Sequence, residues 1–159
     1  MDTIKIDYNA LRKDDWSDQE SQNAKLIIDF VQHLMNDHDF EYVAQKFGHQ
    51  NYVQHNRNIP DGLDALIDYV KNFSKQFPEY AYDVKHIYTD GDHVIFHSHA
   101  TVKRKHRGND KKGFNIIDKW RVKNGEIMEH WDAIQPLDAF MRFYIWMVGG
   151  KIRNTNGVY

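Results

Sequence analysis

The sequence predicts an α+β fold, a cone-shaped α+β barrel in which N-terminal helices pack on a strongly curved antiparallel or mixed sheet. In the first half of the chain, apolar residues recur with the 3.6-residue period of helices, whereas over residues 80–136 they alternate with the two-residue period of strands. Two turn pairs, Asp90-Gly91 and Asn124-Gly125, interrupt this second half where hairpin turns are expected. We expect the sheet to curl around the longest helix and to leave a cavity at one end.

Three helices are expected in the first half. The first begins at Ser17, because Ser17 and Glu20 form the Ser-x-x-Glu pattern of a capping box. Its apolar face then consists of Leu26, Ile27, Phe30, Val31 and Leu34. A second, short helix fits DFEYVAQKF and ends at Gly48, and a third opens at residues 60–61 and ends before Pro78. The intervening segment NYVQHNRNIPDG is predicted as a loop, since Asn, Pro and Gly gather there.

Two hairpins and a final helix are expected in the second half. The first hairpin occupies YAYDVKHIYTDGDHVIFHSHATVKR, and the second occupies GFNIIDKWRVKNGEIMEHWDAIQP. Apolar residues at helical spacing follow from residue 137 to residue 148. We therefore predict one domain over residues 1–159, with an N-terminal extension (1–16) and a C-terminal helical tail (137–159).

The composition narrows the classes of function. The formal net charge is −2, so we expect neither nucleic acid nor a membrane as partner. The chain contains no cysteine, which excludes disulfides, thiolate metal sites and cysteine nucleophiles. The polar N-terminus does not fit a signal peptide, and no apolar run reaches the roughly 20 residues that span a bilayer. A cytoplasmic protein is expected.

Two carboxylates in the second hairpin are candidates for acid–base chemistry. Asp118 shares its strand face with apolar residues, where a charge is costly unless it is paired or used. With a two-residue Asn124-Gly125 turn and no bulge, Asp118 lies opposite Trp131, and Asp132 points to the other face. A β-bulge would instead bring both acids to one face.

Two histidines, His97 and His99, lie two residues apart in VIFHSHATVKR and therefore share a face. A turn at Asp90-Gly91 would place Val84 and Tyr82 opposite them, in a mixed surface that suits a pocket wall. We expect at least one of these imidazoles to reach the carboxylate of Asp118. The same histidines, together with His55, His130 or Asp132, would also suit a zinc or nickel site, which is an alternative.

The motifs YVQHN…PDG, HSH and IIDKWRVKNGEIMEHWDAIQP together resemble the SnoaL-like, polyketide cyclase-like proteins of the nuclear-transport-factor-2-like superfamily. The resemblance covers roughly residues 20–136. It implies the cone-shaped fold, a small-molecule cavity and homodimers through the open sheet face. Relatives include cyclases, ketosteroid isomerase, limonene epoxide hydrolase and non-catalytic binding modules, so the fold does not determine the reaction.

The resemblance also implies roles for particular residues. Asp118 corresponds to an aspartate that exchanges protons with substrate in the cyclases and the isomerase, Asp132 resembles one used in the epoxide hydrolase branch, and His55 borders the cavity mouth. His99 or His55 would stabilise an enolate. The expected substrate-binding residues are His97, Trp120, Trp131 and Tyr82.

Our first hypothesis is therefore an enzyme without cofactor or metal that acts on a small apolar carbonyl compound, by aldol-type cyclisation or isomerisation. One alternative is a non-catalytic module that binds a small apolar or aromatic molecule in the same cavity. The other is a metal-dependent enzyme that uses His97 and His99.

Overall fold

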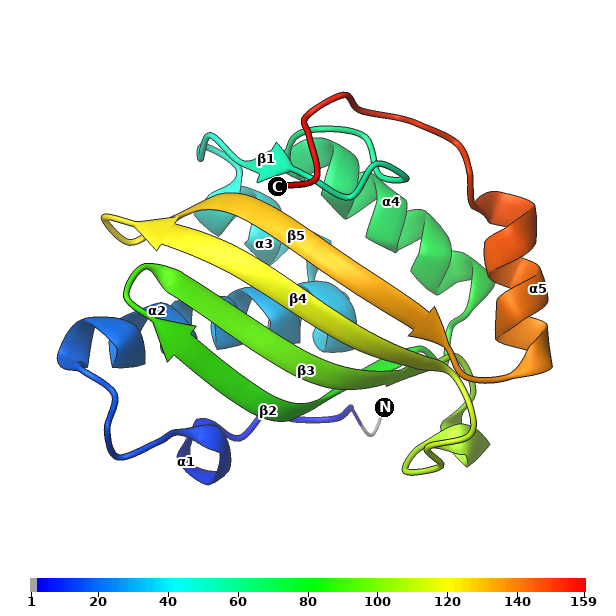
Figure 1. Cartoon of the computed structure of the whole chain (residues 1–159), viewed down its shortest axis with the longest axis horizontal. Helices are drawn as coiled ribbons and strands as arrows, with labels where there is room; N and C mark the ends of the chain where they lie inside the picture. The colour runs from blue at the N-terminus through cyan, green and yellow to red at the C-terminus, as the bar shows by residue number, and fades with distance from the viewer. Residues whose placement is uncertain (1–2) are drawn as a thin grey trace.

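The computed structural model describes residues 3–159 and confirms the α+β class. Five strands form one mixed sheet in the order β1-β5-β4-β3-β2, with helices α2 and α3 behind it and α4 beyond its β5 side in the view of Figure 1. The helices are α1 (Tyr8–Leu11), α2 (Asp18–Val31), α3 (Phe40–Phe47), α4 (Leu63–Gln76) and α5 (Ala139–Val148). The strands are β1 (Val53–Gln54), β2 (Ala81–Asp90), β3 (His93–Thr101), β4 (Phe114–Lys123) and β5 (Glu126–Pro136). Strand β1 runs parallel to β5, and the other neighbours are antiparallel.

Helix α2 begins as the sequence predicts, because the capping box of Ser17 and Glu20 is formed in full. Among residues 3–159, three helical segments were not predicted: α1, which lies in the N-terminal extension, a π-helical segment η1 (Gln32–Asp37) that continues α2, and a single turn of 3-10 helix, η2 (Arg104–His106), after β3. Helix α4 starts at Leu63 and not at residues 60–61, because Gly62 at its N-cap has a φ of 89°, which lies outside the helical range.

The hairpin of β2 and β3 has a different register from the prediction. Asp90 pairs with His93, so the turn residues are Gly91 and Asp92, and a bulge follows between Val84 and His86. His97 therefore pairs with His86, and His99 pairs with Asp83, in place of the predicted Val84 and Tyr82. The extra residue of the bulge reverses the alternation of faces along β2.

The hairpin of β4 and β5 has the predicted two-residue turn, but it also contains a bulge. Asn124 and Gly125 both have positive φ, as the commonest two-residue hairpin turn requires. Arg121 pairs with Glu129 whereas the next residue, Val122, pairs with Ile127, so one residue of β5 is left over. The bulge-free register is therefore wrong: Asp118 lies opposite Asp132, and both acids share a face.

The main core lies between the helices and the inner face of the sheet, where residues such as Ile27, Phe30, Phe96 and Ile127 are fully buried. The predicted C-terminal tail is helical only over α5. Beyond α5 the chain turns back across the molecule to lie beside β1 (Figure 1). Among residues 3–159, no helix combines the length and apolar character needed to cross a bilayer.

Candidate functional site

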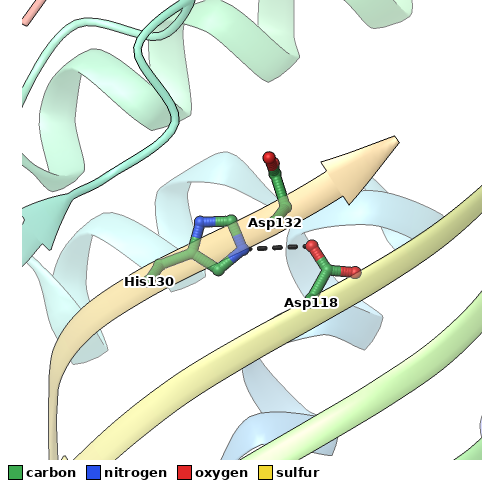
Figure 2. A group of neighbouring side chains, drawn as sticks. All are labelled: Asp118, His130 and Asp132. Atoms are coloured by element: carbon green, nitrogen blue, oxygen red, sulfur yellow. Dashed lines mark hydrogen bonds and ion pairs between the residues drawn. The ribbon is translucent and has the colours of Figure 1, made fainter. Parts of the chain in front are cut away.

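A cavity of about 130 Å³ lies between the inner face of the sheet, helices α2, α4 and α5, and the loop after β1. Its lining is mostly apolar or aromatic and includes Phe30, Leu34, Leu66, Phe73, Ile116 and Ile145. The hydroxyl-bearing lining residues are Tyr52, Tyr69, Tyr80, Tyr82 and Tyr144. Three titratable side chains besides the tyrosines, Asp118, His130 and Asp132, lie together in the wall (Figure 2). We call these three residues the acid–base trio.

The trio comes from two neighbouring strands, Asp118 from β4 and the other two from β5 (Figure 2). His130 Nε2 lies 3.0 Å from Asp118 Oδ1, and the Tyr82 hydroxyl donates a hydrogen bond to Asp118 Oδ2. Asp118 and His130 are both almost completely buried. Both oxygens of Asp118 are therefore engaged by protein groups.

Asp132 is held differently. Both of its carboxylate oxygens face Asn56 Nδ2, at 2.6 and 2.8 Å, and the side chain lines the cavity. Burial raises the pKa of Asp132, the nearby charge of Asp118 raises it further, and His130 opposes the shift. A carboxylate with a raised pKa and free lone pairs toward a cavity is suited to exchange protons near neutral pH.

Three tyrosines beside the trio stay neutral over the physiological range. Burial is the largest cause that raises the pKa of Tyr52, Tyr80 and Tyr82. The negative charge of Asp118 adds to the rise in all three, and that of Asp132 adds to it in Tyr52 and Tyr80. Neutral phenolic hydroxyls in an apolar wall are hydrogen-bond donors for an oxygen that gains negative charge.

The trio is also the one group, among residues 3–159, whose possible metal-ligand atoms all lie within 4.8 Å of one another. One imidazole and two carboxylates suit Zn²⁺, Mn²⁺ or Fe²⁺. The metal set predicted around His97 and His99 is not formed among these residues.

The predicted position of His97 and His99 in the cavity is wrong. His97 Nε2 lies 2.7 Å from Asn115 Oδ1, and His99 Nε2 lies 2.7 Å from the carbonyl oxygen of Lys112. In β3 the fully buried residues are the alternate ones, such as Phe96, so the two histidines occupy the outer face of the sheet.

The predicted positions of His55 and Trp131 at the cavity are also wrong. Neither lines it. His55 stacks on Trp131 with ring centroids 4.4 Å apart, and its nitrogens lie 2.8 Å from the Gly157 carbonyl and 3.0 Å from Glu129. Lys119 Nζ also lies over the Trp131 ring, 4.0 Å from its centroid. Because the bulge in β5 moves Asp132 to the inner face, its neighbour Trp131 turns outward.

Trp120 and Tyr82 do line the cavity, and their part in substrate binding stays a prediction. The sequence predicts His130 only as a possible metal ligand, whereas in the structure it is the imidazole that contacts Asp118. The motif EHWD does indicate this position of His130. His130 precedes Asp132 by two residues, so the two side chains lie on the same face of the strand, and that face is also the face of Asp118.

The sequence profile of the SnoaL-like polyketide cyclase family matches residues 25–141, more than half of the chain. The chain belongs to this family. None of the curated proteins matches it.

Solved structures of other proteins have folds similar to that of this SnoaL-like chain. A protein of Bacillus cereus ATCC 10987 proposed to be a polyketide cyclase is 22% identical, with a TM-score of 0.62, over 86% of this chain and 87% of its own. AclR of Streptomyces galilaeus, a proposed hydroxylase, is 16% identical, with a TM-score of 0.56, over 82% and 97%. An NTF2-like protein of unknown function from Cytophaga hutchinsonii ATCC 33406 is 13% identical, with a TM-score of 0.53, over 72% and 90%. At such identities these structures show the fold alone.

Proposed function

We propose that this SnoaL-like protein is an acid–base enzyme that acts on a small apolar carbonyl compound by aldol-type cyclisation or isomerisation. One observation carries the proposal: the acid–base trio lies in the wall of a cavity that is otherwise apolar and aromatic. Apolar walls bind a hydrocarbon skeleton, and a few placed polar groups orient it. Proton transfer by positioned side chains contributes about 10²- to 10⁴-fold to such reactions.

Asp132 is the general base in this proposal. The sequence pointed first to Asp118, but both oxygens of Asp118 are bonded to His130 and Tyr82. Asp132 faces the cavity, Asn56 is its only hydrogen-bonding partner among the described residues, and burial raises its pKa. Its carboxylate takes a proton from the carbon beside the carbonyl. The electrons of that C–H bond form a C=C bond, and the carbonyl oxygen becomes an enolate oxygen.

The enolate oxygen accepts a hydrogen bond from a neutral hydroxyl near the trio, such as that of Tyr52, because the Tyr82 hydroxyl already donates to Asp118. In a cyclisation, the enolate carbon attacks a second carbonyl of the same molecule, and the new alkoxide takes the proton back from Asp132. In an isomerisation, that proton returns to a different carbon of the enolate. Both reactions return the protein to its starting protonation state. The pair of His130 and Asp118 supplies a second group beside the substrate that can exchange protons.

Exchange of carbon-bound hydrogen for deuterium tests the first step without knowledge of the product. The protein is dialysed against a chelator and incubated in D₂O with a panel of planar apolar ketones and 1,3-diketones, and loss of the α-proton signals is followed by NMR. We expect the wild type to accelerate exchange, Asp132→Asn to lose the acceleration, and Asp83→Asn, which alters a carboxylate paired with Lys85 away from the cavity, to retain it.

Other outcomes overturn the proposal. Compounds that bind in the cavity without exchange would show a binding module. Exchange that disappears on chelation and returns with a divalent ion would show a metal-dependent enzyme.

A homodimer also stays a prediction, which light scattering of the purified protein tests.

A further inference from the structure

We propose that Gln54 is a positioning residue that sets where the protons lie on both His130 and Tyr52. The importance of Gln54 for catalysis rests on the proposed function, but the proton positions can be measured without any substrate turnover. Gln54 ends the two-residue strand β1, which pairs with β5 at His130, and its side chain is completely buried. The sequence placed this residue in a loop and gave it no role.

The orientation of the Gln54 amide is fixed by its surroundings. The backbone N–H of Asn56 lies 2.9 Å from one amide atom, and because a backbone N–H can only donate, that atom is the oxygen, Oε1. The amide nitrogen, Nε2, then donates to the hydroxyl oxygen of Tyr52 at 3.1 Å. The reversed amide would set two donors against each other.

This orientation determines which nitrogen of His130 carries hydrogen. Nδ1 lies 3.1 Å from Gln54 Oε1, and an amide oxygen only accepts, so Nδ1 is protonated. A neutral imidazole with hydrogen on Nδ1 has a bare Nε2, yet Nε2 lies 3.0 Å from Asp118 Oδ1. Two lone pairs at that distance repel, so one further proton lies between His130 and Asp118. The pair therefore holds a proton that it can transfer.

The same amide directs the hydroxyl of Tyr52. The hydroxyl oxygen accepts the hydrogen bond from Gln54 Nε2, so its own hydrogen points elsewhere. Tyr52 lines the cavity, and it stays neutral because burial and the charge of Asp132 raise its pKa. Its hydrogen is thus available to a substrate oxygen. One buried amide prepares both a transferable proton and a hydrogen-bond donor.

A direct test uses the unaltered protein. Long-range ¹H–¹⁵N correlation spectra of the imidazoles report which nitrogen is protonated, and His130→Gln identifies the His130 signals by their disappearance. We expect a protonated Nδ1 in His130 and a second proton shared by Nε2. A neutral His130 with hydrogen on Nε2 alone would overturn the inference, whether or not any substrate turns over.

Three variants test whether the Gln54 amide controls the proton position on His130 and the rate of deuterium exchange. Gln54→Leu removes both amide partners, so the proton of neutral His130 should move to Nε2, and deuterium exchange should fall about 10- to 100-fold, as expected when reacting groups lose their alignment. Gln54→Glu keeps an acceptor for Nδ1 and should keep the protonated Nδ1, but Tyr52 would then donate to the new carboxylate. Gln50→Leu removes a hydrogen bond from the backbone N–H of Ile127 and is the structural control.

The outcomes separate the two proposals. If Gln54→Leu keeps the proton on Nδ1 and exchanges at the wild-type rate, the positioning role is refuted. If the wild type exchanges no compound of the panel but His130 has a protonated Nδ1, the proposed function fails and the account of Gln54 stands. Should the Gln54 variants not fold, the spectrum of the wild type still decides the proton positions.

Discussion

Replacement of Asp118 by asparagine separates the role of this side chain in proton transfer from its role in the stability of the fold. In the wild type one oxygen faces His130 Nε2 and the other accepts from Tyr82. Asparagine has the same shape: its oxygen can accept from Tyr82, and its amide N–H can donate to a bare His130 Nε2. Both contacts survive, whereas the charge and the shared proton are lost. We therefore expect a melting temperature within a few degrees of the wild type and deuterium exchange slower by about 10²- to 10⁴-fold.

The matched variant Asp118→Ala leaves the Tyr82 hydroxyl and His130 Nε2 without partners in a buried site. Each orphaned group costs about 1–3 kcal/mol, so the free energy of unfolding should fall by about 2–6 kcal/mol. At this chain length, where each kcal/mol shifts Tm by about 2–4 °C, the melting temperature should fall by roughly 4–24 °C. Calorimetric melts and the exchange assay on both variants measure the two effects. An asparagine variant that melts as low as the alanine variant, or that exchanges at the wild-type rate, would refute this reasoning.

Two further predictions concern stability. Because the pKa of Asp132 is raised in the folded state, folded protein binds more protons than unfolded protein between the ordinary value of 3.8 and the raised one, and stability falls as pH rises through that window. Asp132→Asn should therefore melt higher than the wild type at pH 7, with the gap closing toward pH 4; a variant less stable at pH 7 would contradict this. Asn154, which is buried, donates to the carbonyls of Asn56 and Ile59, so Asn154→Ala should cost about 1–3 kcal/mol and speed amide hydrogen exchange over residues 54–59. The exposed Thr155→Ala is its control, and equal exchange in the two variants would remove the predicted role of the tail.

The periodicity of apolar residues was enough to predict the helices α2, α3 and α4 and both hairpins. Ser17, Gly48 and Asn124-Gly125 act through local backbone chemistry, which explains why the sequence alone located those boundaries. Strand β1 escaped prediction because its two residues form a strand only by pairing with β5. No local propensity marks so short an element.

The site was harder to predict because it depends on two β-bulges. A single extra residue in β5 brings Asp132 and His130 to the face of Asp118 and turns Trp131 away from it. Whether a strand accommodates such a residue is decided by packing across the sheet, which periodicity does not report.

The outward position of His97 and His99 did have a signal in the sequence. Val94, Phe96 and Ala100 form the more consistently apolar of the two faces of β3, and they are the buried ones. The two histidines alternate with these residues along the strand. The sequence is therefore sufficient to predict which face of β3 is buried, although it does not determine how β3 pairs with β2.

The most direct test of the central claim, that the cavity holds an oxygen-bearing planar compound against the acid–base trio, is a crystal structure with 2-naphthol. This phenol is a flat apolar ring system with one oxygen, like an enolate. The account predicts that the ring fills the cavity and that its oxygen lies about 3 Å from a polar atom of Asp132, His130 or Tyr52. A ring bound outside the cavity, or one whose oxygen points to Tyr144 at the α5 side of the cavity, would contradict it.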